Sequence, residues 1–91
     1  MSKERIRIFY RKNLKMSAGK LASQSVHAAL MLRGALSSMD CIVFGVSDYK
    51  FRQMVKNIPG VKVFADAGKT EVAPGTETCL AYIEEVDDRD E

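Results

Sequence analysis

The chain has 91 residues, of which 46% are hydrophobic and 29% are charged, and its formal net charge at pH 7 is +2. This length fits one domain with a modest core, and the composition is ordinary for a globular protein. No apolar run is long enough to span a membrane, and the charged N-terminal residues include no apolar signal segment. We therefore expect a protein of the cytoplasm.

The charges are distributed unevenly along the chain. Residues 1–20 contain seven basic residues against Glu4 alone, which gives a net charge of +6. Residues 84–91 contain six acidic residues and a single basic one. We expect the basic segment to bind phosphate, although an ordinary solvated surface is the plain alternative. The acidic segment is predicted to be a disordered tail after a single domain of residues 1–83.

Strand and helix patterns alternate along the chain. Alternating or continuous apolar runs predict four strands, at residues 6–10, 41–46, 61–65 and 78–83. Amphipathic stretches free of glycine and proline predict two helices, over residues 20–33 and 49–57. This order predicts an α/β fold, with parallel pairing across each helix and antiparallel pairing of the last two strands. The sheet is therefore expected to be four-stranded and mixed.

Several finer expectations follow from the same pattern. Ser17 is the expected N-cap of the first helix, and Ser47 or Asp48 that of the second. The continuous apolar run 41–46 is typical of a strand that is buried on both faces. Cys41 and Cys79 both fall inside predicted strands, and two cysteines do not make a disulfide framework. Both are therefore expected to be buried, reduced thiols.

The connection between the last two predicted strands, residues 66–77, is longer and more polar than a hairpin needs. It contains the carboxylate of Asp66, the ammonium of Lys69 and the rigid Pro74-Gly75 pair. Loops of this kind are often functional, although a wide hydrogen-bonded turn would give the same pattern. If the first and third strands are parallel, this loop lies at the sheet edge where the basic connector 11–19 also ends.

The first predicted helix contains a polar stripe formed by Lys20, Gln24 and His27, which are spaced i, i+4 and i+7. This stripe either faces water or lines a site. Gly19 and the free amides at the helix start suit an anion or a phosphate. His27 is the only histidine, and a lone helical histidine is more often structural than catalytic.

Several familiar catalytic arrangements are absent from the sequence. Gly19-Lys20 is not a P-loop, because Leu14 and Leu21 occupy positions that require glycine and a hydroxyl residue. One histidine and two scattered cysteines cannot supply a metal-ligand set. No Ser-His-Asp arrangement can be derived from spacing. The groups that can meet at one edge of the sheet are Lys20, Asp66, Thr70 and Thr76.

Two segments in this order form a paired pattern that is more specific than either segment alone. They read Leu14-Lys15-Met16-x-x-Gly19-Lys20-x-Ala22-x-Gln24-x-x-His27-Ala28 and Asp66-Ala67-Gly68-Lys69-Thr70-x-x-Ala73-Pro74-Gly75-Thr76. Over residues 5–83 the chain resembles the type II peptidyl-tRNA hydrolases of archaea and eukaryotes. The resemblance implies a three-layer α/β/α domain that hydrolyses the ester bond of peptidyl-tRNA. It implies no metal or organic cofactor.

The resemblance also implies roles for individual residues. Asp66 would orient or activate the attacking water, Lys20 would stabilise developing charge or hold the terminal phosphate, and Thr76 would add a catalytic hydrogen bond. The implied substrate-binding residues are Gln24, His27, Lys69, Thr70 and Gly75. The implied tRNA-binding residues are Arg11, Lys12 and Lys15, with Lys69 adding a further contact to the tRNA backbone.

The chain also departs from the family pattern. Lys69 stands where the family usually has arginine, and the segment after the first helix is shorter than usual. A smaller scaffold leaves one sheet face less covered, from which we predict a homodimer. Two other functions stay open, namely a non-catalytic RNA-binding or regulatory relative and a hydrolase of another acyl or aminoacyl ester.

Overall fold

A mixed β-sheet forms the centre of the protein. The structure is a computed structural model that describes residues 2–32, 41–67 and 72–87. Within these residues the strands are β1 (Ser2–Arg11), β2 (Cys41–Val46), β3 (Lys62–Ala65) and β4 (Glu77–Asp87), in the spatial order β2-β1-β4-β3. β1 is parallel to β2 and antiparallel to β4, which is also antiparallel to β3. The predicted α/β class and the four-stranded mixed sheet are confirmed.

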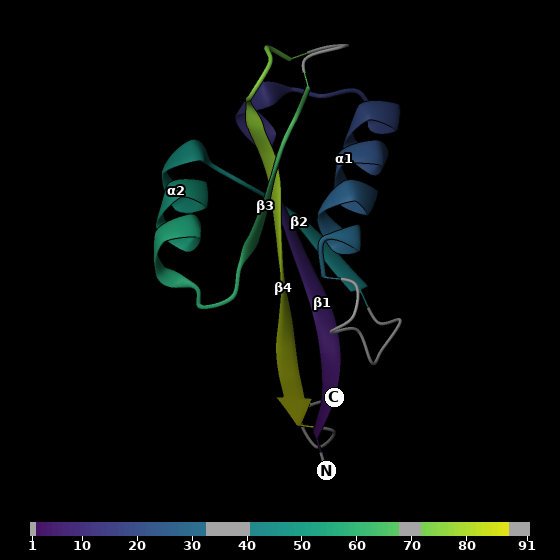
Figure 1. The fold of residues 1–91 in the computed structure, drawn as a ribbon, viewed down its shortest axis with the longest axis vertical. Helices are drawn as coiled ribbons and strands as arrows, with labels where there is room; N and C mark the ends of the chain where they lie inside the picture. Colours follow the sequence, from purple (N-terminus) through teal and green to yellow (C-terminus); the bar gives the residue numbers. More distant parts are fainter. Residues whose placement is uncertain (1, 33–40, 68–71, 88–91) are drawn as a thin grey trace.

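The two described α-helices are α1 (Ala18–Leu30) and α2 (Asp48–Asn57), which lie on opposite sides of the sheet (Figure 1). Each begins at a serine cap, because the hydroxyls of Ser17 and Ser47 accept backbone N–H groups three residues later, both at 3.2 Å. The Ser17 cap is confirmed, and Ser47 rather than Asp48 caps the second helix. Neither helix is long and apolar enough to cross a membrane.

Each face of the sheet packs against one helix. Because side chains alternate across a strand, neighbouring residues of β1 and β4 belong to different layers of the core. The buried residues of the α1 face are Ile6, Ile8, Ala28, Leu32, Cys79 and Ala81. The buried residues of the α2 face are Phe9, Phe51, Met54 and Leu80. Both layers share the two central strands, which hold the helices in fixed positions relative to the strand ends.

The prediction that residues 41–46 are buried on both faces is wrong. β2 stands at the end of the strand order, and Val43 and Phe44 are 44% and 46% exposed. Hydrophobicity along a strand does not reveal whether the strand is central, which explains the error. The expected burial of Cys41 is wrong for the same reason, whereas Cys79 is fully buried and its burial raises the pKa of the thiol to about 11.

The acidic segment after residue 83 does not begin as a disordered tail, so that prediction is wrong for its first four residues. β4 continues to Asp87, which is in register with Ser2 at the start of β1. Arg7 of β1 forms a 2.9 Å ion pair with Glu84 of β4. The basic start of the chain therefore pairs with its acidic end across the sheet. Residues 88–91 lie outside the described part of the chain.

Candidate active site

The segments that the sequence identified as candidate site elements lie together at one edge of the sheet, the edge formed by strand ends. Since β1 and β3 run in the same direction, their C-terminal ends lie at this edge. The short 3₁₀ helix η1 (Lys12–Leu14), the N-terminus of α1 and the described ends of the 66–77 loop lie there together, at the top of Figure 1. The predicted convergence of these segments is confirmed for the described residues.

A buried ion pair joins α1 to the end of β3. The Lys20 ammonium lies 2.8 Å from Asp66 Oδ1, and the two side chains are only 9% and 7% exposed. Gln24 Nε2 donates to the same oxygen at 3.0 Å and is itself fully buried. Lys20 and Gln24 are one helical turn apart, so the helix presents an ammonium and an amide to one carboxylate. The polar stripe of α1 therefore lines a site at these two positions.

Thr78 completes this buried network, and sequence reasoning missed it. Its hydroxyl donates to Gln24 Oε1, and the residue is fully buried. Phe64 pairs with Cys79 but Ala65 pairs with Glu77, so Thr78 is the extra residue of a β-bulge. A bulge re-aims a side chain that strict alternation would send to the other face. The only signal in the sequence for this role was a threonine at the start of the apolar run 78–83. We call Lys20, Gln24, Asp66 and Thr78 the edge site.

The base of the 66–77 loop is closed by backbone hydrogen bonds. The Asp66 N–H donates to Thr76 O at 2.9 Å, and the Gly75 N–H donates to Asp66 O at 2.7 Å. The Thr76 N–H donates to Ala73 O at 3.1 Å. Gly75 has φ = +81°, a left-handed conformation that favours glycine. Two predicted site residues, Gly75 and Thr76, are thus attached directly to the backbone of Asp66, while Lys69 and Thr70 lie outside the described residues.

His27 lies further along α1, outside the hydrogen bonds of the edge site. Its ring contacts the Phe64 ring of β3, with the two centroids 4.7 Å apart and the planes tilted by 47°. Together with Leu30, Met31 and Lys62 these rings line an open groove of about 410 Å³. His27 therefore marks the wall of a groove beside the site.

The predicted tRNA-binding residues differ in their surroundings. Arg11 points toward the protein, because its Nε donates to Asp48 Oδ1 at 3.0 Å and its Nη1 donates to Glu77 O at 2.9 Å. This hydrogen bond from Arg11 lowers the pKa of Asp48 below its usual value of 3.8. Lys12 and Lys15 are exposed on η1 and the residue that follows it. The exposed charge of this segment is therefore carried by the two lysines.

The edge site can support acid–base chemistry at one carboxylate. Asp66 is held by two donors in a buried position, which fixes the orientation in which it can accept a proton from water. Lys20 places a positive charge where a developing oxyanion can be stabilised. The described residues contain no group of three or more His, Cys, Asp or Glu side chains that could hold a metal ion.

Comparisons with known proteins do not assign the chain to a family. No protein-family model matches the sequence, and no curated protein is significantly similar to it.

Proposed function

We propose that the protein hydrolyses the ester bond of peptidyl-tRNA and releases the peptide and free tRNA. The buried Lys20–Asp66 pair, fixed by Gln24 at a sheet edge next to exposed lysines, carries this proposal. In ester hydrolysis by water a carboxylate can serve as the general base and an ammonium can stabilise the oxyanion. Their position beside a basic segment suits a substrate that consists mainly of phosphate backbone.

In the proposed reaction Asp66 accepts a proton from water as the water oxygen attacks the carbonyl carbon of the ester. The Lys20 ammonium stabilises the negative charge that develops on the carbonyl oxygen. The bond between that carbon and the ribose 3′ oxygen then breaks, and the 3′ oxygen takes up the proton that Asp66 had accepted, which restores the carboxylate. Gln24 and Thr78 act as positioning residues, because Gln24 holds the Asp66 carboxylate and Thr78 in turn holds Gln24.

The exposed lysines Lys12 and Lys15 support binding of the tRNA backbone. Contacts to phosphate release counterions, so affinity is expected to fall steeply as salt rises. Arg11 has a second role, since it also joins β1 to α2 through Asp48. A cytoplasmic location, where translation takes place, belongs to the same proposal.

Homodimer formation is a further part of the proposal. The edge strand β2 exposes Val43 and Phe44 on opposite faces, and α1 exposes Val26 and Leu30. Exposed apolar side chains on an edge strand favour pairing with a second chain. Sedimentation at about 100 µM, a concentration suited to weak dimers, is expected to show a dimer that Phe44→Lys dissociates. A monomer at that concentration contradicts this part.

The activity is tested with labelled peptidyl-tRNA and variants that keep the shape of the site. Asp66→Asn is expected to slow hydrolysis at least about 100-fold, because an amide cannot accept the proton. Asp48→Asn is the matched control, since it neutralises a carboxylate on the other face of the sheet. It is expected to leave the rate within about two-fold, as surface substitutions usually do.

Two outcomes favour the other functions. A wild-type protein that binds tRNA in a salt-dependent manner without turnover favours the non-catalytic RNA-binding relative. Hydrolysis of unacetylated aminoacyl-tRNA at a rate similar to that of peptidyl-tRNA favours a hydrolase of other acyl esters. Equal rates for wild type, Asp66→Asn and Asp48→Asn contradict the assignment of Asp66.

A further inference from the structure

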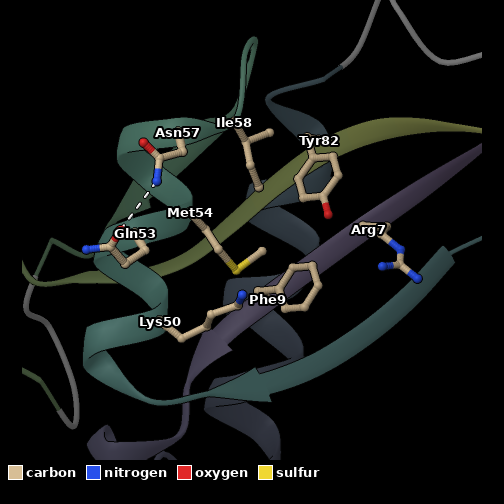
Figure 2. A pocket seen from close by; sticks show the side chains of 8 residues that line it. All are labelled: Arg7, Phe9, Lys50, Gln53, Met54, Asn57, Ile58 and Tyr82. Atoms are coloured by element: carbon tan, nitrogen blue, oxygen red, sulfur yellow. Dashed lines mark hydrogen bonds between the residues drawn. The ribbon is translucent and has the colours of Figure 1, made fainter.

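A second pocket lies on the α2 side of the sheet, away from the edge site. It has a volume of about 460 Å³ and is bounded by α2, β1 and β4 (Figure 2). α2 is shorter than the strands beneath it, so part of the β1–β4 surface extends past the helix (Figure 1). The pocket is formed where the helix covers this surface only in part.

Two aromatic rings form the floor of the pocket. Phe9 of β1 and Tyr82 of β4 have nearly parallel planes, at 6°, with centroids 6.1 Å apart. Both side chains rise from the sheet toward α2, next to the apolar side chains of Met54 and Ile58 (Figure 2). Phe9 is only 9% exposed, whereas Tyr82 is half-buried. The Tyr82 ring, with Phe9 packed beside it, is therefore an aromatic platform on which a planar ligand can stack.

The pocket also has a positive charge at its rim. The charge of Arg7 is balanced by Glu84, at 2.9 Å. Lys50 belongs to the first turn of α2, where its backbone N–H is used by the Ser47 cap. Among the described residues no ion pair or hydrogen bond involves the Lys50 ammonium. It is therefore the charge of this pocket that a bound anion would neutralise.

Two carboxamides stand on consecutive turns of α2 at the same rim. Asn57 Nδ2 donates to Gln53 Oε1 over 3.4 Å, a long contact between two exposed side chains (Figure 2). A bond of this length between exposed groups is weak and is easily exchanged for a ligand. Together the two amides offer both donors and acceptors, as the edge of a heterocyclic base requires.

We propose that this pocket binds a nucleotide, with the base on the aromatic platform, its edge at the two amides, and the phosphate at Lys50. An inorganic anion would use Lys50 but neither the rings nor the amides. An apolar ligand would use the rings but leave the amides and the charge unmatched. A volume of about 460 Å³ is within the usual range of small-molecule pockets.

The nucleotide can come from two sources, a free mononucleotide or one unit of an RNA strand. The chemistry of recognition is the same for both. The proposal does not depend on the hydrolase activity, because the pocket and the edge site lie on different faces of the sheet and share no residue.

The test uses calorimetric titration of the full chain with AMP, GMP, CMP and UMP, and with a short single-stranded RNA. Inorganic phosphate and the uncharged nucleosides serve as ligand controls. Lys50→Ala is expected to weaken binding of the preferred nucleotide about ten-fold through loss of a charge-assisted hydrogen bond. Lys56→Ala removes the same charge from the same helix outside the pocket, and is expected to change affinity less than about two-fold.

The site of binding is checked by NMR chemical shifts. Nucleotide binding is expected to move the signals of Tyr82, Gln53 and Asn57, and a double Gln53→Ala and Asn57→Ala variant is expected to lose preference among the four bases. Binding of RNA alone, with Lys50 dependence and these shifts, identifies an RNA strand as the source. Binding of mononucleotides with the same dependence identifies the free nucleotide.

Three results overturn the proposal. One is the absence of binding by every mononucleotide and by RNA up to about 5 mM, where even weak ligands would be detected. Another is equal weakening by Lys50→Ala and Lys56→Ala, which would indicate only general attraction between charges. The third is inorganic phosphate that binds as tightly as the nucleotides, which would show that the aromatic platform and the amides take no part.

Discussion

Two ion pairs join helices to strand ends in this protein, and they differ mainly in exposure. Lys20 in the first turn of α1 binds Asp66 after β3, and Asp48 at the start of α2 binds Arg11 at the end of β1. The contact distances are similar, 2.8 Å and 3.0 Å. The side chains of the first pair are 9% and 7% exposed, and those of the second are 23% and 34% exposed for Arg11 and Asp48.

We interpret this difference as the distinction between a structural contact and the proposed functional one. A partly exposed pair costs little desolvation and contributes little, so Arg11–Asp48 is adequately explained as an attachment of α2 to the sheet. A buried pair often stabilises a fold less than apolar side chains of the same volume would. Stability alone therefore does not account for Lys20–Asp66. A carboxylate held in a dry, charged position is instead what the proposed chemistry needs.

Breaking the buried pair on one side gives the largest expected effect. Lys20→Met leaves Asp66 buried without its cation and is expected to lower the free energy of unfolding by about 3 kcal/mol. The double variant Lys20→Met with Asp66→Leu is expected to recover most of this loss, because no uncompensated charge remains. Urea denaturation measures both. A double variant that is less stable than Lys20→Met would mean that the pair is retained for stability.

The next largest effect is expected for Gln24, the amide that connects Asp66 to Thr78. Gln24→Leu removes the bonds to Asp66 and to Thr78 and leaves buried polar groups unsatisfied, which is expected to cost about 2 kcal/mol. Gln53→Leu on α2 is the matched control, because that amide is exposed, and is expected to change stability by less than about 0.5 kcal/mol. Similar losses of unfolding free energy for the two variants in urea denaturation would show that the buried amide stabilises the fold no more than the exposed one.

The order of elements was accessible from the sequence because each element carries its own signal. The capping serines, the helical periodicity of α2 and the alternation in residues 6–10 are local patterns, and together they restrict the topology to a mixed sheet. That β2 is an outermost strand of the sheet could not be predicted from the sequence. Its apolar run satisfies the pattern of a central strand, and only the pairing shows that Val43 and Phe44 face outward.

The edge site could be predicted in part from the sequence. Lys20 and Asp66 were predicted to meet at one edge, because the direction of parallel strands is enough to bring their segments together. Gln24 was predicted only to share the polar stripe of Lys20, from helical spacing. Thr78 was missed because its place depends on a bulge, a departure from alternation that no residue type announces. The inward role of Arg11 was missed for a related reason. Its partner Asp48 lies 37 residues away, on an element whose distance from β1 the sequence did not give.

A smaller effect is expected from two glycines with left-handed backbones. Gly75 has φ = +81° and Gly60 has φ = +72°, and an added Cβ meets no neighbour within 4 Å at either position. Alanine at each is therefore expected to cost about 1 kcal/mol, from backbone strain alone. Only Gly75→Ala is expected to slow hydrolysis, since the Gly75 N–H binds Asp66 O. Equal effects of the two substitutions on the hydrolysis rate would show that the 66–77 loop takes no part in the reaction.

The smallest effect is expected at the exposed pair, and its pH dependence identifies it. The hydrogen bond from Arg11 lowers the pKa of Asp48 below 3.8, so the pair contributes stability above that pH and loses it as pH falls through the lowered value. Asp48→Asn is therefore expected to melt slightly below wild type at about pH 7, with the difference shrinking as the pH falls through the lowered pKa of Asp48. Thermal unfolding of both proteins across this range measures it. A difference that grows on acidification would give Asp48 a role other than binding Arg11, and the contrast with the buried pair would then rest on Asp66 alone.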